Sequence, residues 1–392
     1  MNIKPSFPFG IICIVVVSLA LSSCEKQKGS TEPTTSAVIG VIPKTLGTIS
    51  VPADNPMTDA KIELGRHLFF DKELSVDHST SCATCHNPSA GFSDLRGLRT
   101  SMGFGQRMGT RNAPSLANVA YNTIFTWDGS FKTLEAHAPG PIFNSLEMGN
   151  NFSTGRDPRD SVPSGYHSDP GSSDSNQLFA RLNGQSDAAG KRLPELYTAA
   201  FSTQKISIAG IAKAIATYER TFISTQSTFD KFNNGDESAY KNNPQALHGY
   251  QLFIDKNGAN CISCHSGYNF TDQQFHDNGI GVLPTGSASS TDMGRSAVTK
   301  NKSDNFKFKT PSLRNVALSA PYMHDGRFAT LTQVLNHYNK GGVGTSVDAN
   351  QDQHVHALNL SDGDIADIIE FLKTLSDERF TVNPKYIDPW GK

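Results

Sequence analysis

The sequence of 392 residues lacks a long hydrophobic run, an excess of charge of either sign and a surplus of cysteine. Its 35 Lys and Arg residues and 37 Asp and Glu residues leave a net charge of -2, and the two signs are interspersed. This balance excludes the basic surface that binds nucleic acid or acidic lipid. A hydrophobic content of 37%, with 33 Gly and 20 Pro, is typical of a globular, loop-rich protein. The length suits two domains better than one core.

The most apolar stretch of the chain lies near its N-terminus, at residues 9–21, and is too short for a typical membrane span. It predicts an export signal over residues 1–23. Residues 21–24 read Leu-Ser-Ser-Cys, which resembles the lipobox of bacterial lipoproteins, in which Cys24 is acylated and becomes the mature N-terminus. The alternative is a simple signal peptide with an incidental cysteine. Residues 24–50 are expected to form a flexible tether, so that a lipid on Cys24 anchors a periplasmic protein to the membrane.

Only six cysteines occur, and none is left over for a disulfide framework. Cys13 lies in the export signal and Cys24 is the acylation candidate. The other four form two C-x-x-C-H motifs: Cys82, Cys85 and His86, then Cys261, Cys264 and His265.

C-x-x-C-H is the signature at which haem c is attached to a protein. The two thiols span two vinyl groups of one porphyrin, and the next residue turns its imidazole toward the iron. The sequence therefore predicts two covalently bound haems, with His86 and His265 as proximal iron ligands. A zinc knuckle and a thioredoxin-like redox pair are the alternatives for one such motif. Two copies behind an export signal favour haem.

The two motifs lie in similar halves of the chain. The matching segments are 65–72 with 249–256, 114–120 with 311–317, and 128–134 with 325–331. The last two pairs keep the same offset, so no gap is needed. This repeat predicts two cytochrome domains related by internal duplication, over residues 51–238 and 239–392.

Both domains are expected to be mainly α-helical, because haem pockets of this kind are lined by helices. Helical patterns cover residues 208–222 and 361–375, and Ser361 is a candidate N-cap. The second pattern carries an apolar stripe at Ile365, Ile368, Ile369, Leu372 and Leu375. Residues 149–175 are rich in Ser, Asp, Pro and Gly without an apolar period, which predicts a surface insertion.

The repeat register makes the two halves unequal. Tyr338 stands seven residues after the end of segment 325–331, and Pro141 stands seven residues after the end of the matching segment 128–134. A phenol can bind iron and a proline cannot. If this position faces the distal side, His265 and Tyr338 close the C-terminal haem, whereas the N-terminal haem keeps an open site for a peroxide. Alternatively, Tyr338 is an aromatic core residue; neighbouring His337 is a rival ligand but points to another helix face.

These features resemble the bacterial dihaem cytochrome c peroxidases and their relative MauG, over about residues 62–375. The motifs that carry the resemblance, besides the haem sites, are residues 111–114 (RNAP), 126–129 (TWDG), 140–141 (GP), 146–148 (LEM) and 320–326 (APYMHDG). The resemblance implies hydrogen peroxide as substrate and two haem c groups with one calcium ion as cofactors.

Two departures point toward the MauG-like branch of the family. Peroxidases that need prior reduction carry a His in a Gly-His-Gly-like loop that caps the N-terminal haem, and here Phe104 occupies that place. The same peroxidases close the C-terminal haem with Met, where this chain has Tyr338, as MauG does. A phenolate favours higher iron oxidation states than a thioether does, so this haem suits storage of a second oxidising equivalent.

The resemblance also assigns catalytic roles. Glu147 matches the distal glutamate, which can move a proton between the two peroxide oxygens. His137 stands ten residues earlier, where the family usually has Gln; taken alone, it would be a hydrogen-bonded surface residue. Trp127 matches the tryptophan between the haems, which carries electrons; its alternative role is packing.

The predicted calcium site lies between the domains. Asn112 and the backbone carbonyls of Ser319 and Pro321 match the calcium ligands of the family. Amide and carbonyl oxygens suit a hard cation, and waters would complete the shell.

We expect an enzyme that reduces hydrogen peroxide to water at the N-terminal haem, with electrons passed through the C-terminal haem from a small cytochrome c or cupredoxin. One alternative is MauG-like oxidation of residues on a partner protein. Another is a non-catalytic dihaem electron carrier, which the open iron beside Pro141 disfavours. The sequence leaves open whether two copies form a homodimer.

Overall fold

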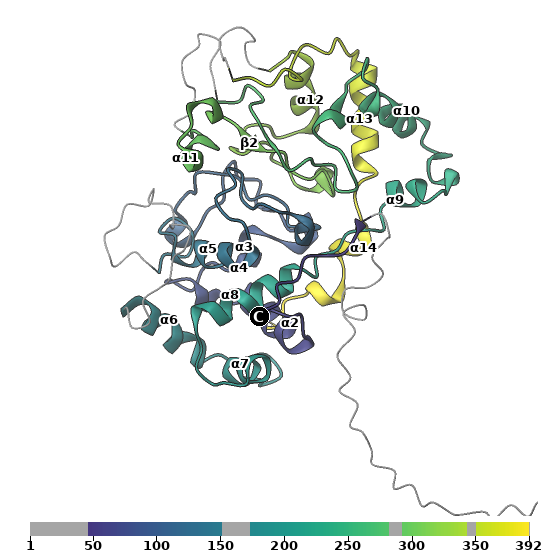
Figure 1. The fold of residues 1–392 in the computed structure, drawn as a ribbon. Coiled ribbons are helices and arrows are strands. Elements are labelled where there is room, and N and C mark those ends of the chain that lie inside the picture. Colours follow the sequence, from purple (N-terminus) through teal and green to yellow (C-terminus); the bar gives the residue numbers. More distant parts are fainter. Residues whose placement is uncertain (1–45, 151–172, 282–291, 343–349, 392) are drawn as a thin grey trace, which may run out of the picture.

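The computed structural model describes residues 46–150, 173–281, 292–342 and 350–391 (Figure 1). The predicted export signal, Cys24 and most of the tether lie outside these residues, as does most of the predicted insertion. Within the described ranges, no helix is both long and apolar enough to cross a membrane.

The protein is mainly α-helical, as predicted. Up to residue 233 the α-helices are α2 (Asp59–Phe70), α3 (Cys82–Cys85), α4 (Leu134–His137), α5 (Pro139–Phe143), α6 (Ser173–Asn183), α7 (Leu193–Phe201), α8 (Ile208–Glu219) and α9 (Thr228–Asn233). Beyond it they are α10 (Pro244–Ile254), α11 (Ser296–Thr299), α12 (Leu331–Asn339), α13 (Asp362–Lys373) and α14 (Glu378–Thr381). In the described part of the chain, the strands are β1 (Phe275–His276) and β2 (Phe308–Lys309), which pair antiparallel.

Helix α13 begins where the sequence predicts. The Ser361 side chain accepts a hydrogen bond from Asp364 N at 3.1 Å, and the Asp364 carboxylate accepts one from Ser361 N at 3.0 Å. This capping box satisfies N–H groups that a helix start leaves without partners. Most of the predicted stripe is fully buried, at Ile365, Ile368, Leu372 and Leu375, and Ile369 packs against it half-buried.

The duplication is visible in the first helix of each half. Helix α2 packs on α8, and α10 packs on α13. Gly65 and Gly249 hold matching positions at these crossings. A Cβ atom on Gly65 would lie 2.1 Å from the Ala214 carbonyl oxygen, and one on Gly249 would lie 1.9 Å from that of Asp367. Both crossings therefore bring backbones into contact, which glycine alone permits.

Each half has its own apolar core, but the C-terminal tail returns to the first one. In that core, Phe92 and Phe222 stack with ring centroids 3.8 Å apart. The tail adds three buried aromatic side chains to it, those of Phe380, Tyr386 and Trp390. Trp390 Nε1 donates to the His67 carbonyl oxygen at 2.9 Å, and Figure 1 shows the C-terminus beside α2. The tail thus connects the second half to the first. The predicted domain bounds place the tail in the second domain, and these bounds stay a prediction.

The two halves meet through a reciprocal pair of hydrogen bonds. Trp127 and His324 hold the same repeat position, directly before the repeated Asp-Gly, and Asn112 and Lys309 form a second matched pair. Asn112 N–H donates to the His324 carbonyl oxygen at 2.7 Å, and Lys309 N–H donates to that of Trp127 at 2.7 Å. Such an exchange is typical of a two-fold interface. An approximate two-fold axis therefore passes between Trp127 and His324.

Gly249→Ala should destabilise the protein, because the added methyl group would overlap the Asp367 carbonyl and force α10 away from α13. We expect a cost of about 1–3 kcal/mol, seen as a lower midpoint of urea unfolding. Gly363→Ala, in the first turn of α13, is the matched control, because the nearest atom would lie 3.6 Å from its new methyl group. That variant should be neutral or slightly stabilising. An unchanged midpoint for Gly249→Ala would contradict the close crossing.

Candidate functional site

A continuous cavity of about 1340 Å³ lies between the halves. It exceeds the roughly 300–1,000 Å³ of a typical pocket for one small ligand. All predicted site residues except Cys82 line it: Cys85, His86, Asn112, Trp127, His137, Glu147, Cys261, Cys264, His265, Ser319, Pro321 and Tyr338. The fold therefore gathers both C-x-x-C-H motifs and their predicted partners around one space.

The two proximal histidines are oriented alike. His86 Nδ1 lies 3.0 Å from the Phe92 carbonyl oxygen, and His265 Nδ1 lies 2.9 Å from that of Phe270. A carbonyl oxygen only accepts, so each Nδ1 carries the proton and each Nε2 keeps a free lone pair. Burial lowers the pKa of both imidazoles, which favours the neutral, ligating form. This outer hydrogen bond is the one that commonly orients a metal-binding histidine.

The four cysteines of the two motifs form no disulfide. Burial raises the pKa of Cys85 to about 11 and that of Cys261 to about 12. A thioredoxin-like redox cysteine needs a lowered pKa instead, so the environment does not favour that alternative. The cavity, the thiols and the histidine orientation fit one covalent haem in each half.

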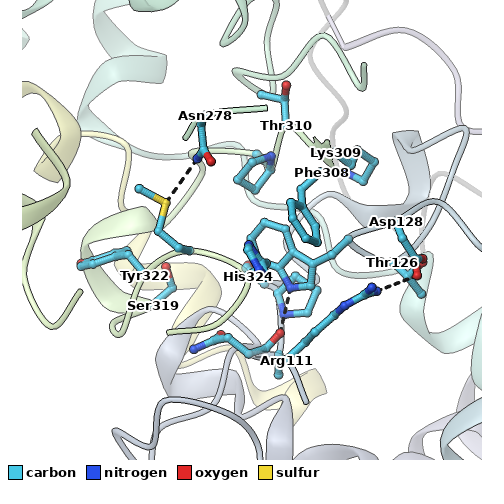
Figure 2. A pocket seen from close by; sticks show the side chains of 18 of the residues that line it. Arg111, Thr126, Asp128, Asn278, Phe308, Lys309, Thr310, Ser319, Tyr322 and His324 are labelled. Atoms are coloured by element: carbon cyan, nitrogen blue, oxygen red, sulfur yellow. Dashed lines mark hydrogen bonds and ion pairs between the residues drawn. The ribbon is translucent and has the colours of Figure 1, made fainter. Parts of the chain in front are cut away.

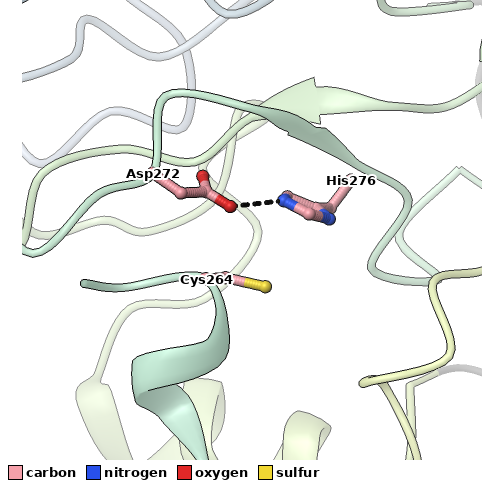
Figure 3. Close-up of side chains that lie close together, drawn as sticks. All are labelled: Cys264, Asp272 and His276. Atoms are coloured by element: carbon pink, nitrogen blue, oxygen red, sulfur yellow. Dashed lines mark hydrogen bonds and ion pairs between the residues drawn. The ribbon is translucent and has the colours of Figure 1, made fainter.

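Figure 3 shows Cys264, Asp272 and His276, whose ligand-type atoms lie within 4.8 Å of one another. His276 Nε2 is 2.9 Å from Asp272 Oδ2, and Nδ1 is 2.6 Å from Asp352 Oδ2. With carboxylates on both sides the ring donates from both nitrogens and keeps no lone pair for a metal. Cys264 belongs to the haem motif. No set of four ligands converges among the residues that the structure describes, so zinc has no closed structural site there.

Pro141 and Tyr338 occupy matching positions on the cavity wall. In the second half, α12 runs without a break through Tyr338. In the first half, Pro139 and Pro141 have no N–H group to donate, and the matching segment is divided into α4 and α5. At this position the C-terminal site has a phenol oxygen and the N-terminal site has no ligand atom.

The structure distinguishes Tyr338 from its rival His337. Tyr338 lines the cavity, and its Oη accepts a hydrogen bond from Asn278 Nδ2 at 3.1 Å. Burial raises the pKa of this phenol to about 12, against the lowering effect of the Asn278 bond. His337 does not line the cavity, and its Nε2 donates to the Asn278 backbone carbonyl at 2.8 Å. Of the two, Tyr338 is therefore the one that faces the cavity that His265 also lines.

Glu147 lines the cavity on the side of the N-terminal motif. Burial raises the pKa of its carboxyl to about 7, although a 2.8 Å hydrogen bond from Asn144 Nδ2 opposes this. His137 lines the same cavity, and burial lowers the pKa of its imidazole to about 4. Near neutral pH, Glu147 can exchange a proton and His137 stays uncharged.

The loop that carries Phe104 is packed over Glu147. Phe104 N–H donates to the Glu147 carbonyl oxygen at 2.8 Å, and the Phe104 side chain is only 7% exposed. Its ring lies so close to Gly149 that a Cβ atom there would be 2.4 Å away. The position of the switchable histidine in other peroxidases thus holds a buried apolar side chain.

A stack of rings lines the cavity where the two halves meet. The Trp127 and His324 rings meet edge to face with centroids 6.5 Å apart, and His324 stacks on Phe308 at 3.6 Å. Trp127 Nε1 donates to the Asn112 carbonyl oxygen at 2.8 Å. His324 Nε2 is buried without a hydrogen-bond partner, and burial lowers the pKa of this imidazole to about 4. His324 is therefore a neutral ring beside Trp127.

Charge near this stack is paired. The Arg111 guanidinium lies 5.7 Å from the Phe308 ring centroid and forms ion pairs with Asp128 and Asp292, both at 2.7 Å. Figure 2 shows the pair with Asp128. Asp292 belongs to the second half, so the ion pair also ties the halves together. Two carboxylates offset the positive charge of Arg111 beside the rings.

The three predicted calcium ligands, Asn112, Ser319 and Pro321, all line the cavity. Asn112 Nδ2 donates to the Pro321 carbonyl oxygen at 3.1 Å and to that of Arg99 at 3.4 Å. The amide nitrogen, and not the oxygen, therefore faces these carbonyls in this structure. Calcium at this site stays a prediction.

Sequence reasoning missed His324, Phe308 and Asn278. The repeat register carried a signal for His324, which is the counterpart of Trp127, and for Phe308, which is the counterpart of Arg111. Asn278 lies outside the matching segments, and no pattern marked it.

Known proteins share this organisation. Residues 59–238 match the family described as di-haem cytochrome c peroxidase, and residues 246–376 match the cytochrome c family. The chain is 36% identical to the methylamine utilization protein MauG of Methylorubrum extorquens, over 83% of this chain and 81% of that protein. It is 33% identical to the cytochrome c551 peroxidase of Pseudomonas aeruginosa, over 83% and 81%.

A solved structure shows the same fold. It is the crystal structure of a MauG-like protein associated with microbial copper homeostasis, with a TM-score of 0.76 and 30% identity over 89% of this chain and 98% of that one. Family match, relatives and fold agree with the two haem motifs on one cavity. The chain belongs to the dihaem cytochrome c peroxidase family, which includes MauG, and is an oxidoreductase enzyme of that family.

Proposed function

We propose that the protein reduces hydrogen peroxide to water at its N-terminal site, with electrons that enter at the C-terminal site from a small cytochrome or cupredoxin. The observation that carries this proposal is the inequality of the two halves at Pro141 and Tyr338. Cys82, Cys85 and His86 would hold the haem that supplies the iron for reaction with peroxide, and Pro141 offers no atom that could bind that iron. A pure electron carrier gains nothing from a free position.

Glu147 is the proposed proton-transfer group. A carboxyl with a pKa of about 7 is present in both protonation states near neutral pH. It can accept the proton of the inner peroxide oxygen and return it to the outer one. The hydrogen bond from Asn144 holds the carboxylate in place, and neutral His137 can orient the peroxide without adding charge.

Trp127 is the proposed electron bridge between the sites. Its indole N–H donates to the Asn112 carbonyl, which is not a base, so the ring can lose and regain an electron while its proton stays in place. Neutral His324 and the paired Arg111 add no uncompensated positive charge beside the ring. Both features favour fast, reversible electron transfer.

A second candidate function is the peroxide-dependent oxidation of residues on a partner protein, in the manner of MauG. Two observations favour it: the buried Phe104 in place of a switchable histidine, and Tyr338 on the wall of the C-terminal site. A phenolate ligand stabilises oxidised iron and suits the storage of oxidising equivalents until a partner arrives.

We place this function in the periplasm, with the protein anchored by a lipid at Cys24 and calcium held by Asn112, Ser319 and Pro321. Export fits the covalent haem motifs, and all three predicted calcium ligands line one cavity.

Glu147→Gln should slow the reaction with peroxide by about 10²–10⁴-fold, the usual effect of losing a general acid–base group. The carboxylate accepts the first proton, so the wild-type rate should rise as pH increases through about 7 and then level off. Stopped-flow rate constants measured against pH should show this rise in the wild type and not in the variant.

His137→Gln is the control for this pH profile. The His137 imidazole has a pKa of about 4 and stays uncharged through this pH range, so the variant should keep the rise near pH 7. If the rise persists in Glu147→Gln, another group is the base.

Fully oxidised protein mixed with one equivalent of peroxide and no reductant should react at once, because no ligand at Phe104 must first leave the N-terminal site. Optical and EPR spectra should show rapid loss of the high-spin ferric signal.

A long-lived oxidised species would favour the partner-oxidation function, and rapid turnover only with a reduced donor would favour the peroxidase. A reaction that starts only after partial reduction would contradict the assignment of Phe104, and no reaction would favour the electron carrier.

A further inference from the structure

We infer that Asn278 is a positioning residue that sets the ligand strength of Tyr338 at the C-terminal site. The inference rests on the proposed ligation by Tyr338. Asn278 follows β1 in a loop of the second half and lines the cavity together with Tyr338 and His265.

The Asn278 amide is directed at the phenol oxygen. Its Nδ2 lies 3.1 Å from Tyr338 Oη and 3.6 Å from Met323 Sδ, and Figure 2 shows the contact with the sulfur. An amide nitrogen donates two hydrogen bonds and accepts none. Phenol oxygen is the stronger acceptor of the two and the closer one. The donor therefore acts mainly on the atom that would bind iron.

The position of Asn278 is fixed by contacts other than Tyr338. His337 Nε2 donates to the Asn278 backbone carbonyl at 2.8 Å, which ties the backbone of Asn278 to α12. The loop is also anchored next to it, where Asp352 N–H donates to the Asp277 carbonyl oxygen at 3.0 Å. His337, which the sequence offered as an alternative iron ligand, thus holds Asn278, the residue that contacts Tyr338.

A hydrogen bond to a phenolate withdraws electron density from the oxygen. A metal ligand held in this way donates less to ferric iron than a free phenolate does, and such outer contacts tune reduction potentials. Removal of the Asn278 donor should strengthen the oxygen as a ligand. Ferric iron at the C-terminal site should then become harder to reduce.

The test is the midpoint potential of each haem, followed optically in the dihaem protein. Asn278→Leu removes the donor at similar size, and Asn278→Ala removes it without a charge in case Leu does not fold. Both variants should shift the C-terminal haem to lower potential, leave the potential of the N-terminal haem unchanged, and alter the low-spin spectrum. Asn339→Ala is the matched control, because Asn339 follows Tyr338 but bonds to the Leu360 backbone instead. It should leave both potentials unchanged.

The same measurement in a Tyr338→Phe background separates the two possible failures. If Asn278 acts through Tyr338, its effect should disappear there, as expected of coupled residues. An equal shift in both backgrounds, or no shift in either, would overturn the role of Asn278. If Tyr338→Phe itself leaves the low-spin spectrum unchanged, the proposed ligation fails instead.

Discussion

The structure depends on two backbone hydrogen bonds exchanged between matched positions of a duplicated chain. Asn112 donates to the His324 carbonyl, and Lys309 donates to the Trp127 carbonyl. These bonds lie in a buried interface, where an unpaired N–H group is costly, so they fix how the halves meet. They place Trp127 near an approximate two-fold axis and turn both C-x-x-C-H motifs toward one cavity. The proposed electron bridge at Trp127 and the cavity shared by the two haem motifs therefore depend on one interface.

Divergence between matched positions then makes the sites different. Where the second half has a continuous helix and Tyr338, the first has Pro141 and a broken helix. Where the first half has the indole of Trp127, the second has the neutral imidazole of His324. Trp127 is therefore the more easily oxidised ring of this matched pair. Where the first has the amide of Asn112, the second has a buried Lys309, whose pKa burial lowers to about 8. The duplication gives both halves the same fold, and each amino-acid difference at a matched position gives one half a distinct chemistry.

Much of the fold and part of the site follow from local sequence patterns. The C-x-x-C-H motifs and the Ser361 cap can be recognised from a few neighbouring residues, because covalent attachment and helix capping act over short spacings. The repeat register follows from the comparison of short matching segments. The register also predicted that Pro141 and Tyr338 would lie at matching places, and both line the cavity. The contact of Asn278 with Tyr338 joins residues 60 positions apart, and Trp390 reaches back to His67 across 323 positions. No periodicity or motif records such contacts, since they arise only when distant segments of the chain fold against one another.

We propose that the two haem sites are unequal because one faces Pro141 and the other faces Tyr338. The most direct test is a low-temperature EPR spectrum of the resting, fully oxidised protein before any peroxide or reductant is added. We expect one high-spin and one low-spin ferric species in equal amounts, with Tyr338→Phe altering the low-spin species alone. Two low-spin species in the resting protein would contradict it.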